Sequence, residues 1–354
     1  MRQVRHKVAT VAAVLLALGM TQVAVVSGSG ASTSRKAAPR AKTVQIAEFG
    51  YNDSPDGVAF ENGAMLEAKK LGVQVTWFNG NNDPETQYTQ IQDAITSGKY
   101  QAFWIMPLDG TELLPLVKSA DRAGIKVANA DYTLGNTQAT LVLHHTPGTV
   151  TTVGWSVGAA TEGLIAEIRK ACAAKVGTGR SCTVAFMPGL SNYPADTVRV
   201  DMLQKAFGHG PIHLSVMPPG DYDQPTAQKV ALTYFGAHPK VDVFGTLGDQ
   251  MAAGVLTALH QLSIVPGKDI EVIGYGGTKQ LVAGVANGSV FADLGLYPTL
   301  ESELGVKYLV DAVHGEPVPG VVNVLDLPGS PNVLDKAFLK AHPSYRPDWS
   351  LTAP

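Results

Sequence analysis

The sequence predicts an α/β protein with two doubly wound lobes, each formed around a parallel sheet. Three observations lead to this prediction. The chain has 354 residues, which is more than one compact domain usually holds. Strand-like apolar runs alternate with helical segments, a pattern typical of parallel sheets covered on both faces. The alternation begins again after residue 150, which indicates a second lobe of the same kind.

The first half of the chain contains four strand-like runs separated by helical patterns. The runs are TVQIAEF (43–49), VQVTWF (73–78), AFWIMP (102–107) and IKVANAD (125–131). Pro55 and Pro84 stand where helices are expected to begin, and a proline in the first helical turn costs no hydrogen bond. In the second helical segment, Tyr88, Ile91 and Ile95 recur at offsets of three and four and form one apolar face.

The second half repeats this alternation, starting with a helix. We expect helices at 154–175, 195–207, 225–237, 249–262, 278–287 and 299–314, strands at 182–188, 212–218, 241–247, 270–276 and 290–298, and a final apolar run at 321–328. Each lobe therefore has enough strands for a sheet of its own.

Polar and glycine-rich segments follow most of the expected strands. They include YNDSPDG (51–57), PLDG (107–110), DYTLG (131–135), PGLSNYP (188–194), PPGDYD (218–223), GDQ (248–250) and GYGGT (274–278). In doubly wound sheets, ligands bind beyond the carboxyl ends of the strands. These segments therefore form the predicted rim of a ligand site.

The N-terminal segment differs in composition from the rest of the chain. A basic start precedes the apolar stretch 8–20, and small residues follow it. This order predicts a secretory signal peptide over residues 1–31 and a flexible linker over 32–42. An uncleaved membrane anchor is the alternative. We expect an exported, extracytoplasmic protein without a lipid-bearing cysteine near the signal, because the first cysteine is Cys172.

Cys172 and Cys182 are the two cysteines of the chain. Outside the cytoplasm they are candidates for a disulfide between a helix end and a strand start. A pair of buried free thiols is the alternative. Two cysteines make neither a zinc site nor a CxxC redox motif, so we assign them a structural role.

Charge and motif content argue against several classes of protein. The net charge is −3 and no polybasic block follows residue 42, which argues against a nucleic-acid partner. The first strand is not followed by GxGxxG, and GxxxxGK[ST] does not occur, so no nucleotide cofactor is expected. His144 and His145 are adjacent and would point to opposite faces of a strand, while His209 and His213 lack a third ligand. We therefore expect no metal site.

One catalytic pattern does occur. GWSVG (154–158) matches the GxSxG nucleophile elbow, with Ser156 as the nucleophile of a secreted α/β hydrolase. An elbow needs a strand immediately before it, and the preceding TPGTVTTV is rich in Thr and Gly and is a poor buried strand. The hydrolase is therefore kept as the alternative function.

Five segments occur in a specific order and spacing. They are ENGAMLEAKKLGVQV (61–75), QIQDAITSGKYQAFWIMPLD (90–109), ADRAGIKVANADY (120–132), AHPKVDVFGTLGDQMAAGVLTAL (237–259) and EVIGYGGTKQLVAGVANGSVFADL (271–294). In this order they resemble the periplasmic-binding-protein type I family, and especially the ribose-binding-protein-like sugar-binding subunits of ABC importers. The resemblance covers roughly residues 43–342.

The resemblance implies two lobes joined by three crossovers, with a ligand cleft between the lobes. The crossovers fall near 143–153, 292–298 and 324–328, the N-terminal lobe is 43–145 plus 297–325, the C-terminal lobe is 146–296 plus 326–342, and 343–354 form a tail.

The implied function is that of a monomeric, non-catalytic receptor. It would bind a small carbohydrate-like solute, such as a sugar, a polyol or a related cyclic compound, and deliver it to an ABC permease in the membrane. Docking to a sensor or chemoreceptor is left open by the sequence. A transcription regulator of the same fold would need a helix-turn-helix before residue 43, where the signal-like segment stands.

The resemblance also implies site residues. Asp131 matches the family carboxylate after the fourth strand, and an ionised Asp accepts strong hydrogen bonds from hydroxyl groups. Tyr222 falls where the family often has a stacking aromatic residue. With the polar and aromatic residues of the rim, the ligand-binding candidates are Tyr51, Asn52, Asp53, Asp56, Asp131, Tyr132, Asn192, Tyr193, Tyr222, Asp249 and Tyr275.

Several positions depart from the ribose-type pattern. Met106 stands in place of Asn, Tyr132 and Thr197 in place of Arg, Gly248 in place of Asn, Gly276 in place of Asp, and Leu296 in place of Gln. Missing partners would leave the hydroxyls of a polyhydroxylated ring unpaired. Either the polar groups have moved to other residues of the rim, or the ligand is less hydroxylated than a pentose.

Overall fold

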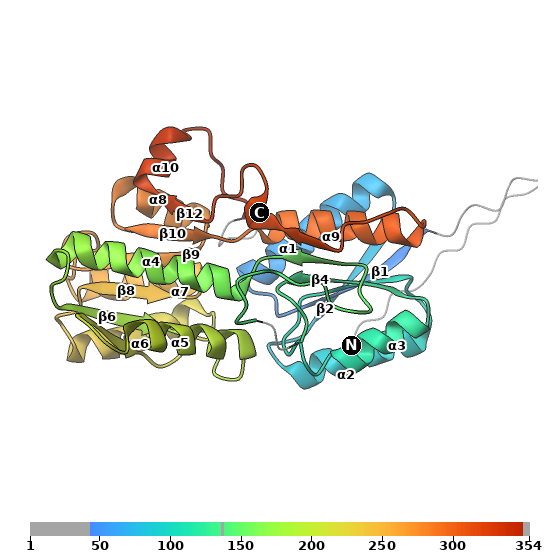
Figure 1. The fold of residues 1–354 in the computed structure, drawn as a ribbon, viewed down its shortest axis with the longest axis horizontal. Coiled ribbons are helices and arrows are strands. Elements are labelled where there is room, and N and C mark those ends of the chain that lie inside the picture. Colours follow the sequence, from blue (N-terminus) through green and yellow to red (C-terminus); the bar gives the residue numbers. More distant parts are fainter. Residues whose placement is uncertain (1–42, 136–137, 350–354) are drawn as a thin grey trace, which may run out of the picture. The chain divides into compact units, whose positions relative to one another are not determined.

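The first of two α/β lobes contains a six-stranded, fully parallel sheet. The computed structural model describes residues 43–135 and 138–349 (Figure 1). The sheet has the order β11-β5-β4-β3-β1-β2, with β1 Gln45–Gly50, β2 Gln74–Asn79, β3 Ala102–Ile105, β4 Lys126–Asp131, β5 Thr151–Gly154 and β11 Val321–Asn323. Helices α1 (Pro55–Leu71) and α9 (Pro298–Val313) pack together on one face, and α2 (Pro84–Ser97) and α3 (Leu114–Arg122) on the other.

The second lobe repeats this arrangement with one antiparallel edge. Its sheet has the order β12-β10-β9-β8-β6-β7, with β6 Cys182–Met187, β7 Ile212–Val216, β8 Val243–Thr246, β9 Glu271–Gly276, β10 Ala292–Gly295 and β12 Val333–Asp335. The helices are α4 Val157–Val176, α5 Pro194–Phe207, α6 Gln224–Ala237, α7 Asp249–Gln261, α8 Lys279–Asn287 and α10 Lys336–Ala341. The predicted architecture of two doubly wound lobes is confirmed, except that the short strand β12 pairs antiparallel with β10.

The strands are apolar because helices cover both faces of each sheet. In β3 and β8 every residue is buried, and Trp104 and Phe244 are among the largest side chains with no exposure. Pro55 and Pro84 occupy the first turns of α1 and α2, as the sequence predicts. The sheets therefore form rigid supports whose carboxyl ends present the loops.

The first crossing between the lobes lies later than the sequence predicts. Strand β5 pairs in register with β4, with Gly154 opposite Asp131, so it belongs to the first sheet. The predicted boundary between residues 145 and 146 is therefore wrong, and the chain leaves the first sheet after Gly154. The Thr-rich sequence of β5 hid this strand, yet all four of its residues are buried.

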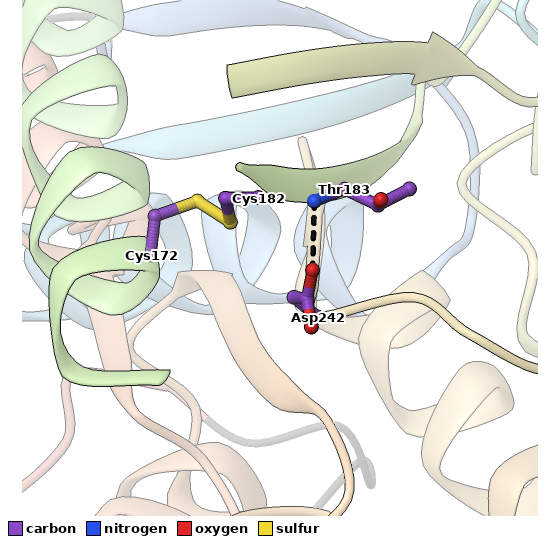
Figure 2. The surroundings of a disulfide bond; sticks show 4 residues. All are labelled: Cys172, Cys182, Thr183 and Asp242. Carbon is purple, nitrogen blue, oxygen red and sulfur yellow. Dashed lines mark hydrogen bonds between the residues drawn. A yellow bond between two sulfur atoms is a disulfide. The ribbon is translucent and has the colours of Figure 1, made fainter. Parts of the chain in front are cut away.

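The predicted disulfide is present at the edge of the second sheet opposite to the strand ends that carry the loops. Cys172 of α4 is bonded to Cys182 at the start of β6, with their Cα atoms 5.8 Å apart (Figure 2). Beside it, the Thr183 N–H donates to Asp242 Oδ2 over 2.8 Å. The disulfide therefore ties a helix end to a strand start.

Part of the predicted tail packs against both lobes. Asp348 Oδ2 accepts a hydrogen bond of 2.9 Å from the Thr299 N–H, at the start of α9. Trp349 is buried, and its Nε1–H donates to the Gly276 carbonyl of β9 over 2.8 Å. Since α9 covers the first sheet and β9 lies in the second, these two residues connect the lobes.

The predicted signal peptide and linker, residues 1–42, lie outside the described residues. Across 43–135 and 138–349, none of the helices combines the length and the apolar character that a membrane crossing requires.

Candidate ligand-binding site

The strand ends of both sheets meet at a cavity of about 60 Å³. This volume is several times the roughly 10–15 Å³ that one water molecule needs on the same measure. Loops after strands of both lobes and the first turns of α1 and α9 form its wall. Six predicted ligand-binding residues line it: Tyr51, Asn52, Asp56, Asp131, Tyr193 and Tyr222.

Asp131 at the end of β4 organises the first-lobe side of the cavity. Its Oδ2 accepts a hydrogen bond from the Tyr51 hydroxyl, and its Oδ1 accepts one of 2.7 Å from Trp155 Nε1–H. Burial raises the pKa of Asp131, while the hydrogen bond from Tyr51, the charge of Arg199 and the hydrogen bond from Trp155 oppose this rise. Both carboxylate oxygens are thus already engaged by the protein.

The backbone around Asp131 is unusual. Its φ of 70° lies in the left-handed region, which Asp and Asn tolerate better than most residues. A Cβ added at the neighbouring Gly154 would lie 2.1 Å from the Asp131 carbonyl oxygen, so only glycine fits there. Trp155, the next residue, lines the cavity.

Two tyrosines connect the lobes across the cavity. The Tyr193 hydroxyl donates to the Tyr51 hydroxyl over 3.2 Å, and their rings meet edge to face with centroids 6.1 Å apart. Tyr51 follows β1 of the first lobe, and Tyr193 precedes α5 of the second. The chain of hydroxyls therefore runs from the second lobe to Asp131.

Asp196 organises the second-lobe side. Its Oδ1 accepts a hydrogen bond of 2.7 Å from the Tyr222 hydroxyl and lies 3.4 Å from Arg199 Nη1, while its Oδ2 accepts one of 2.8 Å from the Leu190 N–H. A Cβ added at Gly189 would lie 2.1 Å from the Tyr222 ring, so this ring packs directly on the backbone. Tyr222 is therefore fixed in place at the cavity.

Arg199 lies between aromatic rings at the cavity wall. Its guanidinium carbon is 4.9 Å from the ring centroid of Trp155 and 5.4 Å from that of Tyr275. The side chain is buried, yet its Nε has no hydrogen-bond partner among the described residues. Since a buried donor without a partner costs free energy, Arg199 is a candidate for binding a ligand in the cavity that it lines.

Two further carboxyl groups line the cavity from the first turns of helices. Glu301 of α9 is buried, and its Oε2 accepts a hydrogen bond of 2.8 Å from the Asp131 N–H. Burial and the charge of Asp131 raise the pKa of Glu301 well above its ordinary value. Burial and the charge of Asp131 also raise the pKa of Asp56, in α1, to about 8.

Five predicted ligand-binding residues do not line the cavity, and the structure gives a reason for each. Asp53 accepts a hydrogen bond of 3.1 Å from Trp77 Nε1–H on the outside of the loop. Tyr132 is buried and its hydroxyl donates to the Pro107 carbonyl. Asn192 is exposed to solvent, and Tyr275 is buried beneath Arg199.

Asp249 is the fifth of these residues and has a structural role. Its Oδ1 accepts a hydrogen bond of 2.9 Å from the Tyr275 N–H, and its Oδ2 accepts one of 2.8 Å from the Thr278 N–H. It is buried with no exposure. The carboxylate therefore holds the loop after β9.

Seven polar or aromatic lining residues were not predicted: Ser54, Phe60, Asn82, Trp155, Arg199, Gln250 and Glu301. A signal for Arg199 was present, because it lies four residues after Ala195 and four before Leu203 on the buried face of α5. An arginine on an apolar stripe next to Asp196 needs a buried partner or a ligand. Glu301 follows a strand end in the sequence YPTLE and carried a weaker signal of the same kind.

The GWSVG pattern has another explanation in the structure. The Ser156 hydroxyl donates to the Thr140 carbonyl over 2.6 Å and accepts a hydrogen bond of 3.0 Å from the Ala159 N–H, which caps α4. Strand β5 does precede it, contrary to the sequence-based expectation. A serine nucleophile requires a hydrogen bond to a general base. The Ser156 hydroxyl bonds to backbone groups instead.

No group of three His, Cys, Asp or Glu side chains within residues 43–135 and 138–349 is arranged to hold a metal ion.

Comparison with known proteins identifies the family. A family model described as a periplasmic binding protein domain matches residues 51–317. The chain belongs to the periplasmic binding proteins. Among relatives of this family, the ribose import binding protein RbsB of Bacillus subtilis is 24% identical over 273 residues, which cover 77% of this chain and 82% of the relative. RbsB of Escherichia coli is 26% identical over 267 residues, covering 75% and 83%.

Solved structures of periplasmic binding proteins share the fold. An ABC transporter solute binding protein from Mycobacterium smegmatis with bound glycerol has a TM-score of 0.70 and 23% identity, covering 87% of this chain and 99% of that one. A periplasmic solute binding protein from Actinobacillus succinogenes with bound D-allose has a TM-score of 0.69 and 19% identity, covering 84% and 100%. At these identities the likeness concerns the fold.

Proposed function

We propose that this periplasmic binding protein is the exported solute receptor of an ABC importer. It binds a small sugar, polyol or related cyclic solute between its lobes and delivers it to a membrane permease. The observation that carries this proposal is the cavity between the two sets of strand ends, whose aromatic and hydrogen-bonding side chains come from both lobes. A ligand that contacts both walls stabilises the closed form because the open form offers only one wall at a time.

The chemistry of the wall suits a hydroxylated ring. Tyr51, Tyr193 and Tyr222 present ring faces and edges for C–H groups, and Arg199 and Gln250 add hydrogen-bonding groups. The named relatives support this class of ligand, since two are ribose import binding proteins and the solved structures contain glycerol and D-allose.

Thermal unfolding of the full chain with a panel of solutes tests the proposal. The panel contains ribose, allose, arabinose, galactose, glucose, their 2-amino derivatives where these exist, myo-inositol and glycerol. We expect one class to raise the melting temperature, and isothermal titration calorimetry to give one site per chain. The proposal fails if no compound binds, and it loses to the hydrolase if p-nitrophenyl esters are turned over and Ser156→Ala abolishes the turnover.

Export and delivery need separate measurements. We expect mass spectrometry of the extracytoplasmic protein to find a mature N-terminus near residue 31, as the signal-like segment predicts. Deletion of the gene should abolish uptake of the labelled solute. A chain that stays in the cytoplasm would contradict the export proposal, and undiminished uptake would favour a sensor partner.

A further inference from the structure

The cavity wall carries more carboxyl groups than cationic groups. Asp56, Asp131 and Glu301 line it from the first lobe, and Arg199 is the cation among the described residues that line it. Behind the wall, Asp196 pairs with Arg199 at 3.4 Å and so takes up much of its charge. A neutral ligand would leave these acidic groups either protonated or buried without a matching positive charge, whereas a cationic ligand favours their ionised form.

The hydrogen bonds divide these carboxyl groups into two kinds. Asp131 accepts one bond on each oxygen, from Tyr51 and Trp155, and is thereby satisfied by the protein. Glu301 accepts a single hydrogen bond, from the Asp131 N–H. The carboxyl group of Asp56 takes part in no hydrogen bond with the described residues, although it faces the cavity. Asp56 and Glu301 thus retain acceptor capacity toward the ligand.

Aromatic rings surround the same space. Phe60 and Tyr51 meet edge to face with centroids 6.3 Å apart, and both line the cavity, as do Tyr193 and Tyr222. Ring faces attract cations, as the contact of Arg199 with Trp155 already shows in this wall. Carboxylates combined with aromatic rings favour an organic cation over a metal ion.

We propose that the solute of this site carries a protonated amino group on its hydroxylated ring, as an amino sugar or an aminocyclitol does. The ammonium group lies toward Asp56 and Glu301, where charge-assisted hydrogen bonds form. A ring hydroxyl accepts from Arg199 Nε, which has no partner among the described residues. This inference rests on the proposed function, because it specifies the ligand of the same cavity.

Matched pairs of compounds test the charge directly. Isothermal titration calorimetry near pH 7 on the full chain compares D-glucosamine with D-glucose, D-galactosamine with D-galactose, and an amino-inositol with myo-inositol. We expect the amine of at least one pair to bind about tenfold tighter than its neutral counterpart. If the neutral member binds as well or better in every pair that binds, the inference is overturned and the proposed function stands. If no member of any pair binds, the inference is overturned, and the remaining compounds of the panel decide the proposed function.

Two isosteric variants locate the charge. Asp56→Asn and Glu301→Gln each remove a carboxylate, and Gln keeps an oxygen that can accept from the Asp131 N–H. We expect each to weaken the amine about tenfold while changing affinity for the neutral partner little, so that the preference for the amine shrinks. Asp53→Asn is the matched control, since this residue lies three residues before Asp56, in the loop that precedes α1, but outside the cavity lining.

The outcomes of the variants are decisive in either direction. An equal loss of affinity for the amine and for the neutral ligand would show that the carboxyl groups bind ring hydroxyls, and would overturn the inference. An unchanged preference in both variants would do the same. Thermal unfolding without ligand identifies a variant that fails to fold, in which case the other variant carries the test.

Discussion

The two lobes bury carboxyl groups at corresponding places, the carboxyl ends of their sheets, but use them differently. In the first lobe Asp56, Asp131 and Glu301 line the cavity. In the second lobe Asp249 and Asp293 are buried with no exposure and lie outside the cavity lining. The first-lobe carboxyl groups line the cavity, whereas the second-lobe carboxyl groups accept hydrogen bonds from the backbone.

The second-lobe pair is occupied by backbone groups. Asp249 accepts from two backbone N–H groups, and Asp293 Oδ2 accepts a hydrogen bond of 3.1 Å from the Gly277 N–H. Burial and the charge of Asp249 raise the pKa of Asp293 well above its ordinary value. A Cβ at Gly276 would lie 2.6 Å from the Asp249 carboxyl carbon, which leaves no space for a solute. A buried carboxylate that accepts hydrogen bonds from backbone N–H groups of a neighbouring loop thus has a structural role, whereas one with free acceptor oxygens at the cavity is a candidate for binding.

The largest expected effect comes from removing a second-lobe carboxyl group, and it is a loss of folding stability. Asp249→Ala leaves the Tyr275 and Thr278 N–H groups buried without acceptors, at about 1–3 kcal/mol each, so we expect a loss of about 2–6 kcal/mol in the free energy of unfolding. Asp249→Asn keeps one acceptor and should lose less. Urea unfolding measures both. A variant that folds with unchanged stability but loses solute binding would show that Asp249 is a ligand residue after all.

The disulfide offers a second stabilising feature of the same lobe, at the opposite edge of its sheet. Cys172→Ala with Cys182→Ala releases a loop with a sequence separation of 10, and the chain-entropy argument gives a loss of about 2–3 kcal/mol. We expect solute affinity to stay unchanged, because the disulfide lies away from the cavity lining. Urea unfolding and calorimetry check the two parts. A large loss of affinity would mean that this edge of the sheet controls the cavity.

The sequence predicted the fold well because its signals are local. Apolar runs, prolines at helix starts and polar loops after strands each predict the local structure in which they occur. Strand β5 was the exception, since a Thr-rich run is buried only because α9 and the neighbouring strands β4 and β11 cover it. That cover comes from residues far along the chain, so no local pattern could show it.

The site was predicted in part for the same reason. Asp131 and Tyr51 stand directly at strand ends, where position alone points to the cavity. Asp249 also stands beyond a strand end, and only its backbone partners from another loop show that it is structural. Arg199 reaches the cavity from within α5, two residues after Thr197, the position that the family pattern indicated. A short shift along a helix changes which face a side chain takes.

Asp131→Asn tests the carboxyl groups that line the cavity, and its expected effect is smaller than that of the two preceding changes. Asn tolerates the left-handed backbone at this position, so the fold should persist. An amide offers one acceptor oxygen in place of two, so either Tyr51 or Trp155 loses its partner. We expect solute affinity to fall about 10- to 100-fold, as is typical for hydrogen bonds to a charged group. Calorimetry measures this, and unchanged affinity would remove Asp131 from the site.

The smallest expected effect concerns the protons of the cavity. Burial and the charge of Asp131 raise the pKa of Asp56 from 3.8 to about 8 in the folded protein. Between these values the folded state holds a proton that the unfolded state releases, so the free energy of unfolding falls as the pH rises through this window. Asp56→Asn removes this dependence, and we expect it to melt roughly 2–5 °C above the parent near pH 9 but close to it near pH 4.

Melting curves from pH 6 to pH 9 isolate this contribution. Other buried carboxyl groups with a raised pKa, such as Asp348 (about 6) and Glu301, are present in both proteins, so the difference between the two curves reports Asp56. Asp53→Asn, which removes a carboxyl outside the cavity lining, should give a curve parallel to the parent. If Asp56→Asn is also parallel, Asp56 is ionised without cost in the free protein. The cavity would then be acidic before any solute arrives, and the contrast with the second lobe, where burial and the charge of Asp249 raise the pKa of Asp293, would be sharper.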